Sequence, residues 1–357
     1  MKVFKLGLNL AMTNWHAGPQ KNVALSIKAE ELGFSSVWCE EAYGTDAVSP
    51  LAWVGALTSH IGLGSAIWQI PARTPAMAAM TAATLDVLSS GRNIIGLGSS
   101  GPQVVEGFHG QPFNRPVSRT REYIDIMRAI IAKEAPVEYR GRDYRLPYDG
   151  NEGTGIGKPL KLIITPKRKR IPIYVGALGP LNIQMTAEIA DGWLPIFFAP
   201  RVWESVFGED LRVGFAKASN GKGPGDGFDV APIVSVVVHD DVNVARRRVK
   251  ERMALYIGGM GHAKLNVSNR LVRRFGYEEV AEEVQQLFLA GRREESIQAV
   301  SDELVDDVAL CGPRERIASL LERWRDSPVT TLICDTDDVH AMEVMADLVG
   351  TCPRAGT

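Results

Sequence analysis

The chain has 357 residues, of which 45% are hydrophobic and 23% are charged, and its 40 basic and 42 acidic residues give a formal net charge of −2. This composition is typical of a globular protein and excludes long disordered stretches. The near-neutral charge provides no overall field that would attract nucleic acid or an anionic membrane. Any binding of anions therefore has to be local. The expected partner is a small-molecule substrate, with no nucleic acid and no membrane.

The four cysteines are scattered and form no Cys-x-x-Cys pair, so the sequence predicts neither a metal site nor a redox dithiol. The first residues run directly into a strand-like alternation, and no stretch of about 18 uninterrupted apolar residues follows. We therefore expect a cytoplasmic protein without a membrane segment. Residues 351–357 are expected to form a flexible tail.

Strand-like and helix-like patterns alternate along the chain. The expected strands cover residues 3–10, 36–39, 61–67, 93–97, 173–175, 193–196, 230–238 and 330–334. The expected helices cover residues 23–32, 50–59, 75–88, 119–131, 180–190, 203–218, 313–324 and 339–348. Eight strands with helices between them predict an α/β fold, a (β/α)8 TIM barrel in a single domain over residues 1–350. No Gly-x-Gly-x-x-Gly motif follows the first strand, which disfavours a Rossmann nicotinamide domain.

Two segments exceed what a barrel needs. Residues 137–170, after the fourth helix, are rich in glycine, proline and charge, and they predict an insertion that can form a hairpin over one end of the barrel. Its basic residues 167–170 precede the fifth strand, where a solvated loop is favoured over a cofactor contact. Residues 242–310, after the seventh strand, read as almost continuous helix and predict a second insertion.

A glycine-containing turn joins the fifth strand to the following helix. It consists of Gly176, Ala177, Leu178, Gly179 and Pro180. Proline suits the first helical position, and bare amides beside a helix N-terminus are a typical phosphate site in α/β proteins. The alternative is that the glycines only shape the turn and let helix and strand approach closely.

The loops that follow the strands form the active face of such a barrel, and they carry little acid-base chemistry. They contribute Asn9, Glu40, Glu41, Asp46, Trp68, Gln69, a Ser/Gly loop at residues 98–102, Glu106 and His109. A cofactor would supply the missing chemistry. The paired acids could instead bind an arginine such as Arg73, a lone loop histidine is more often a structural hydrogen bonder, and Cys39 is expected to be a buried small hydrophobe.

Four segments carry a resemblance to a known family. They are WCEEAYGTDAVSPLAWVGALTSHIGLGSAI, RTPAMAAMTAATLDVLSSGRNIIGLGSSGPQVVEGFHG, IYVGALGPLNIQMTAEIADGW and AVSDELVDDVALCGP. In this order they resemble luciferase-like oxidoreductases of the branch that uses coenzyme F420, and they are most similar to methylenetetrahydromethanopterin-reductase-like proteins. The resemblance extends from about residue 6 to residue 332.

This resemblance implies a barrel with the deazaflavin ring in its mouth. The cofactor phosphate would meet Ser99, Ser100, Gly101, Gly176, Ala177, Leu178, Gly179 and Pro180. The ring would lie near Asn9, Glu40, Glu41, Ala66 and Ile67, and relatives carry a non-proline cis peptide that here would be Ala66–Ile67. Many relatives have an Asp-His pair after the second strand, where this chain has Glu41 and Ala42. Glu41, to orient the ring, and His109, to supply a proton, are therefore the catalytic candidates.

The predicted function is that of an F420-dependent oxidoreductase, which transfers a hydride between the deazaflavin and a C=C, C=N or C=O bond of a small organic molecule. One alternative is an FMN-dependent luciferase-like monooxygenase that uses oxygen. An alternative of another class is a non-catalytic F420-binding protein. An exposed apolar helix in the barrel shell would allow a homodimer.

Overall fold

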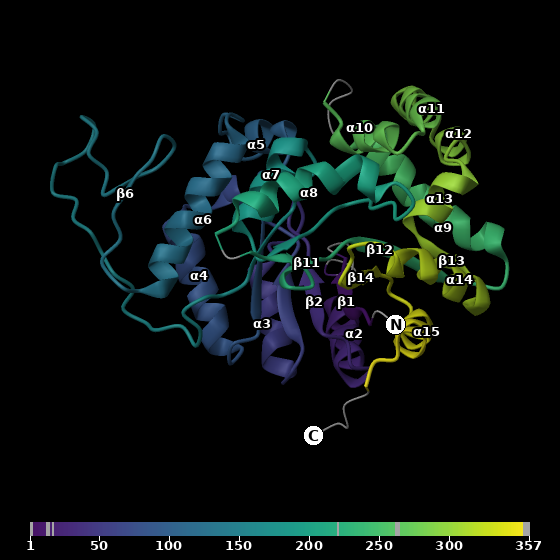
Figure 1. Cartoon of the computed structure of the whole chain (residues 1–357), viewed down its shortest axis with the longest axis horizontal. Helices are drawn as coiled ribbons and strands as arrows, with labels where there is room; N and C mark the ends of the chain where they lie inside the picture. Colours follow the sequence, from purple (N-terminus) through teal and green to yellow (C-terminus); the bar gives the residue numbers. More distant parts are fainter. Residues whose placement is uncertain (1–2, 12–14, 16–17, 220, 261–264, 353–357) are drawn as a thin grey trace.

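Parallel strands close into a barrel in the computed structural model, which describes residues 3–11, 15, 18–219, 221–260 and 265–352 (Figure 1). The barrel strands are β1 (Lys5–Leu10), β2 (Ser36–Cys39), β3 (Gly62–Ser65), β5 (Asn93–Gly98), β8 (Ile173–Val175), β9 (Gly192–Trp193), β11 (Gly227–Val230), β12 (Ile233–Val238) and β14 (Thr331–Asp335). Their order is β11-β9-β8-β5-β3-β2-β1-β14-β12. Because β11 and β12 follow each other in one stretch of chain, the two ends of this path meet, and a bridge between Ile196 and Ile233 completes the closure.

Helices cover the outside of the barrel. They are α2 (Pro19–Glu31), α3 (Val48–Leu57), α4 (Pro75–Leu88), α6 (Pro116–Ala132), α7 (Pro180–Ile189), α8 (Glu209–Lys217), α14 (Arg314–Arg325) and α15 (Val339–Val349). Local sequence sets their ends. The Thr74 hydroxyl accepts a hydrogen bond from the Met77 amide over 3.2 Å at the start of α4, and Gly350, with φ of 74°, ends α15. The predicted TIM-barrel fold is confirmed.

Large side chains fill the inside of the barrel. Trp38 packs against Tyr174 with ring centroids 5.6 Å apart, and Leu194 and Ile333 join them. A Cβ at Gly64 on the neighbouring strand would clash with the Trp38 ring, so glycine makes room for this tryptophan. The interior is therefore a packed core, and a ligand has to bind at its mouth.

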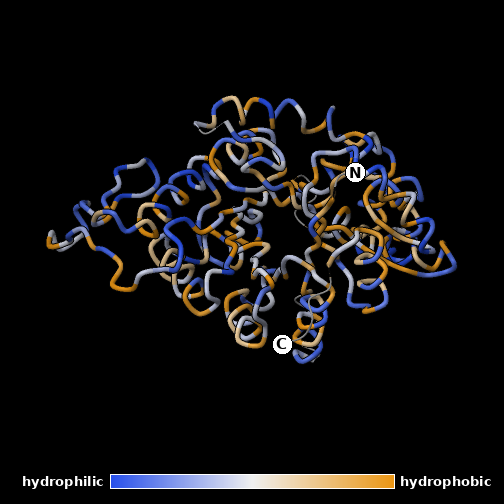
Figure 2. Tube along the Cα trace, turned by 60° about the horizontal axis from the view of Figure 1, so that its bottom comes forward, coloured by the Kyte–Doolittle hydropathy of each residue, from blue (hydrophilic) through white to orange (hydrophobic). Residues whose placement is uncertain are grey.

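The first insertion forms the predicted hairpin, from β6 (Tyr139–Arg140) and β7 (Arg145–Leu146), but its predicted position is wrong. In Figures 1 and 2 it extends sideways beyond α6 and not across an end of the barrel. The reason is the Glu122 carboxylate of α6, which accepts hydrogen bonds of 2.8 to 2.9 Å from the amides of Arg142, Asp143 and Tyr144. The hairpin is thus held on the outer side of the barrel.

Two arginines of the basic cluster at residues 167–170 form ion pairs, while Lys167, Lys169 and Arg170 are exposed, as a solvated loop predicts. Arg168 forms an ion pair of 2.5 Å with the buried carboxylate of Asp86 on α4 and also donates to the Asn93 carbonyl. Arg170 pairs with Asp191 over 2.6 Å. These contacts hold the cluster at the amino end of the barrel, away from the glycine-containing turn.

The second insertion is a set of short helices rather than one continuous helix. It contains α9 (Val242–Ala254), a π-helical turn (Leu255–Gly259), α10 (Val267–Arg274), α11 (Glu278–Leu289), α12 (Arg293–Gln298) and α13 (Asp302–Val308). The strand β13 (Leu310–Gly312), which the helical pattern concealed, pairs in parallel with β12.

At the predicted tail, the Thr351 hydroxyl donates to the Leu32 carbonyl over 2.6 Å, while residues 353–357 lie outside the described residues. Within the described ranges, no helix combines the length and apolarity needed to cross a membrane.

Candidate active site

The two glycine-containing loops lie side by side at the carboxyl ends of neighbouring strands. Leu97 of β5 pairs with Val175 of β8, and the Gly176 amide continues this ladder by donating to the Leu97 carbonyl over 2.8 Å. The loop that holds Ser99, Ser100 and Gly101 therefore adjoins the turn at residues 176–180. Such a place at the strand ends is where ligands bind in α/β barrels.

Gly179 has an ordinary backbone conformation, with φ of −85° and ψ of 151°. A Cβ there would meet no atom within 4 Å, and the same holds for Gly101. The backbone of the turn therefore does not require glycine at position 179. This removes the interpretation that Gly179 is present only to shape the turn. What remains is open space at the N-terminus of α7, where a ligand could lie against the backbone.

The amides of Ala177, Leu178 and Gly179 donate no hydrogen bond to any residue that the structure describes. They directly precede the first turn of α7, whose first residue is Pro180, as the sequence predicted. Unpaired amides and the positive end of a helix dipole favour an anion at this place. The arrangement fits a phosphate group.

The peptide bond between Ala66 and Ile67 is cis, which confirms the expectation drawn from the resemblance. Ile67 lies between the two loops, because a Cβ on Gly98 would come within 2.9 Å of its side chain and one on Gly176 within 3.2 Å. Gly176 therefore makes room for Ile67, a role that the sequence alone did not show. The Ala66–Ile67 peptide therefore lies next to both loops.

Asn9 and Glu40 meet two charged residues that the sequence did not single out. The Asn9 Nδ2 group donates to Glu40 Oε1 over 3.0 Å and to Asp335 Oδ1 over 2.8 Å. Arg252 of α9 forms an ion pair with Asp335 and lies 3.7 Å from Glu40. Asp335 could have been recognised as an acid at the end of the last strand, whereas Arg252 lies in an insertion and gave no signal.

The Asn9 side chain also has an unused acceptor. Asn9 is 3% exposed, and its Oδ1 atom receives no hydrogen bond within the part of the chain that the structure describes. The amide cannot be turned over, because both partners of its nitrogen are carboxylates, which only accept. A buried unpaired acceptor is unfavourable, so this oxygen is suited to an N–H or O–H donor of a bound molecule.

Glu41 lies in an ion pair, as the alternative interpretation anticipated. Arg73 donates to both of its carboxylate oxygens, over 2.6 and 2.9 Å, and the Ala47 amide donates over 3.1 Å. Burial lowers the pKa of the Arg73 guanidinium, but the contact with Glu41 outweighs this and raises it. Glu41 is thereby fixed, and direct contact with a ring would have to compete with these bonds.

His109 is joined to the same network through Gln69. The Gln69 Oε1 atom lies 3.1 Å from His109 Nε2 and 3.1 Å from the Ser100 hydroxyl, and its backbone amide donates to Glu41 Oε1 over 3.3 Å. The structure thus brings both catalytic candidates and the serine loop together around a residue that is 1% exposed.

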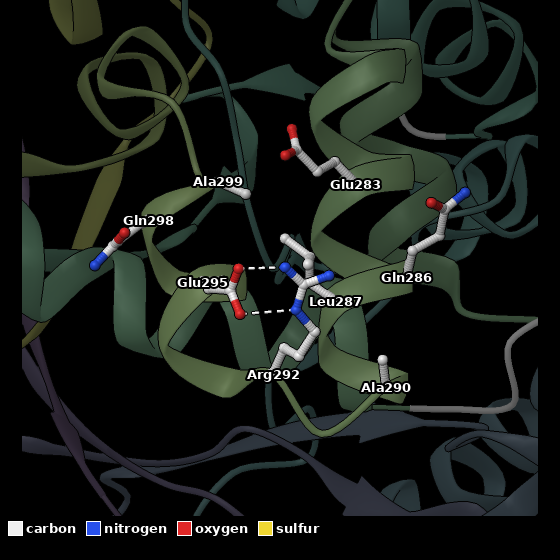
Figure 3. A pocket seen from close by; sticks show the side chains of 8 residues that line it. All are labelled: Glu283, Gln286, Leu287, Ala290, Arg292, Glu295, Gln298 and Ala299. Atoms are coloured by element: carbon white, nitrogen blue, oxygen red, sulfur yellow. Dashed lines mark hydrogen bonds and ion pairs between the residues drawn. The ribbon is translucent and has the colours of Figure 1, made fainter.

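A large hollow lies away from these residues. It has a volume of about 670 Å³ and lies between α11 and α12, where Figure 3 shows Arg292 paired with Glu295 beside Glu283 and Gln286. None of the strand-end residues described above lines it. A smaller cavity at the barrel mouth is lined by Phe197, Arg252 and Met253, among others. Size alone therefore does not identify the site.

Comparisons with known proteins assign the chain to a family. A family model described as luciferase-like monooxygenase matches residues 2–331. The chain is 44% identical to a provisionally named coenzyme F420-dependent oxidoreductase of Mycobacterium tuberculosis, over 97% of this chain and 99% of that one.

Two solved structures share the fold, each with a TM-score of 0.77. One is a coenzyme F420-dependent tetrahydromethanopterin reductase of Methanopyrus kandleri, at 24% identity over 97% of this chain and 98% of that one. The other is an F420-dependent secondary alcohol dehydrogenase in complex with an F420-acetone adduct, at 17% identity over 98% and 99%. This protein belongs to the luciferase-like monooxygenase family, in the coenzyme F420-dependent branch that its motifs resemble.

Proposed function

We propose that this protein is an F420-dependent oxidoreductase that transfers a hydride between the deazaflavin and a small organic substrate. The observation that carries the proposal is the pair of adjoining loops at β5 and β8, with open space before Gly101 and Gly179 and unpaired amides at residues 177–179. The 44% identity to a relative named for F420 supports the choice of cofactor.

The residues present fit the cofactor. The amides of the turn at residues 176–180 would hold its phosphate, with Ser99 beside them. Ala66 and Ile67 would support the ring, and the Asn9 oxygen offers a buried acceptor for a ring or substrate donor. When bound, reduced F420 supplies the hydride, and the protein contributes position, exclusion of water and a proton.

The substrate would have an electron-poor C=C, C=N or C=O bond. Hydride transfer needs the two reacting carbons about 3 to 3.5 Å apart in a shielded place. Since the hairpin insertion lies on the outer side, shielding would come from the second insertion, whose Arg252 reaches the Asn9 cluster. The four free cysteines fit a cytoplasmic location, where thiols stay reduced.

Calorimetry of the purified protein with F420 and with FMN tests the cofactor. We expect binding of F420 and weaker or no binding of FMN, followed by oxidation of reduced F420 by a carbonyl, enone or imine substrate under anaerobic conditions. Binding of FMN without F420, or activity that requires oxygen, would show a monooxygenase. Tight F420 binding with no turnover of any acceptor would favour the alternative of a non-catalytic F420-binding protein.

We further infer a homodimer that forms through α3 and α4. These neighbouring helices expose Trp53, Leu57, Met77, Met80 and Leu88, each at 42% to 65% of its surface. Exposed apolar patches of this kind commonly mark an interface between copies of a chain. Light scattering should give twice the chain mass, and a Trp53→Glu, Met80→Glu double variant should give the monomer. A monomeric wild-type protein would disprove the inference.

A further inference from the structure

The orientation of the Gln69 side-chain amide is fixed by its surroundings. Its Nε2 group lies 2.5 Å from the Ala42 carbonyl oxygen. A carbonyl oxygen only accepts hydrogen bonds, so the amide nitrogen has to face Ala42. The amide oxygen then faces the opposite way, toward Ser100 and His109, although the two ends of an amide look alike by shape.

This orientation determines which nitrogen of His109 carries hydrogen. The Gln69 oxygen can only accept, so both of its neighbours, the Ser100 hydroxyl and His109 Nε2, have to donate. A neutral imidazole has one N–H group, and here it must be at Nε2. The lone pair is then on Nδ1, which accepts no hydrogen bond from any residue that the structure describes.

Gln69 is held firmly enough to impose this choice. It is 1% exposed, it pairs with Gly98 in the short strand β4 (Trp68–Gln69), and its backbone amide donates to Glu41. Glu41 is in turn bound by both terminal nitrogens of Arg73. A chain of hydrogen bonds thus runs from Arg73 through Glu41 and Gln69 to His109.

We propose that Gln69 is a positioning residue that keeps His109 in its Nε2–H form, so that Nδ1 exchanges the proton with the substrate. The inference rests on the proposed function for the use of that proton. In the reducing direction, the hydride adds to one end of the substrate double bond, and the Nδ1–H bond of the imidazolium breaks to give its proton to the other end. The imidazole is left neutral as the Nε2–H form that Gln69 favours, and water returns the proton.

Nitrogen-15 NMR of histidine-labelled protein without cofactor tests the tautomer directly. The pyridine-type nitrogen resonates well downfield of the N–H nitrogen, and we expect the downfield signal of His109 to belong to Nδ1. The spectrum of His109→Gln identifies the signals of His109 among the six histidines. His239, whose Nδ1 lies 3.0 Å from the Asp241 amide nitrogen and 3.2 Å from the Asp241 carbonyl oxygen, serves as an internal reference whose signals should not move. A wild-type His109 with its hydrogen on Nδ1 would overturn the proposal.

Two substitutions separate the acceptor from the bulk of the side chain. Gln69→Met keeps the length but removes the acceptor, and it should give a mixture of tautomers. Gln69→Glu keeps an oxygen facing His109 and should retain the Nε2–H form, with its second oxygen protonated so that it donates to the Ala42 carbonyl in place of the amide nitrogen. The His239 signals should not move in either variant. If Gln69→Met leaves the His109 tautomer unchanged, the proposal is wrong.

Turnover links the tautomer to the reaction. We expect kcat to fall at least about tenfold in Gln69→Met and to be partly restored in Gln69→Glu, because a positioned proton donor contributes at least this much. Equal loss in both variants would contradict the positioning role. If the protein does not use F420 at all, turnover is absent in every form while the NMR result stands, so the two failures can be told apart.

Discussion

Asn9 and Asp335 lie 326 residues apart in the chain, yet the Asn9 amide donates to the Asp335 carboxylate over 2.8 Å. Because β1 and β14 pair in parallel, the first and last barrel strands bring these side chains to the same place. Glu40 accepts the second hydrogen of the amide, and Arg252 provides the positive charge. A neutral donor thus separates two carboxylates at the barrel mouth.

Replacement of Asn9 tests this arrangement. Asn9→Leu removes the donor and should lower the free energy of unfolding by about 1 to 3 kcal/mol. Asn9→Asp should lower it further, because a third carboxylate would face Glu40 and Asp335 with one arginine to balance them. Chemical denaturation measures both. If both variants lost the same free energy of unfolding, the carboxylates of Glu40 and Asp335 would not both lie at the Asn9 side chain.

The Glu41–Arg73 pair should act mainly on stability. Both side chains are largely buried, at 6% and 16% exposure, so Arg73→Met should lower the free energy of unfolding by about 3 kcal/mol through the unpaired carboxylate it leaves. The double variant with Glu41→Gln should lose less than the sum of the single variants.

A more exposed arginine pair offers the control. Arg121 binds both oxygens of Glu188 at the surface, and Arg121→Met should lose less than about 1 kcal/mol. Loss of turnover in Glu41→Gln with unchanged stability would instead support a direct catalytic role for Glu41.

Gly179 should matter for binding and not for folding. Gly179→Ala should leave the free energy of unfolding within about 0.5 kcal/mol, since its backbone is extended and its surroundings are open. Gly179→Val should weaken F420 binding at least about tenfold, because the added atoms occupy the space before the amides.

Gly350→Ala is the control, because it should affect folding and not binding. Gly350 has a left-handed φ of 74° and no neighbour at the Cβ position, so the variant should lose about 1 kcal/mol of stability and bind F420 normally. Unchanged F420 affinity in a folded Gly179→Val variant would remove the turn from the cofactor site.

Lys222 should make stability depend on pH. It is 8% exposed, lies 5.3 Å from the Phe228 ring centroid and donates to the Ala190 carbonyl. Burial lowers its pKa from 10.5 to about 8. Between these values the unfolded chain binds more protons, so this residue makes stability rise with pH from about 8 to 10.5. Below pH 8 the full cost of burying the charge is present.

Lys222→Met should therefore be more stable than the wild type at pH 7, on the order of 1 kcal/mol after the lost hydrogen bond is counted, and the difference should shrink toward pH 10.5. Thermal melting across this range measures it. The exposed Lys217→Met should follow the wild-type curve. If the two proteins differed in stability by the same amount at every pH, folding would not lower the pKa of Lys222.

The sequence by itself determined the barrel. Alternation of strand and helix patterns, helix caps and the glycine-containing turn are local, and each reflects a side-chain period or a backbone preference that a short stretch of chain expresses on its own. The same holds for the strand-end positions of Asn9, Glu40 and the loop at residues 98–102. The cis bond at Ala66 came from the resemblance, not from local chemistry.

Tertiary structure decided which of these residues meet. Glu41 became a partner of Arg73, and Gln69 became the link between Glu41 and His109, because the curvature of the barrel brings these loops together. Glu122 placed the hairpin insertion on the outer side, where its sequence gave no direction. Arg252 reached the mouth from an insertion. Contacts between distant segments depend on how helices and loops pack, and no period within one segment encodes them.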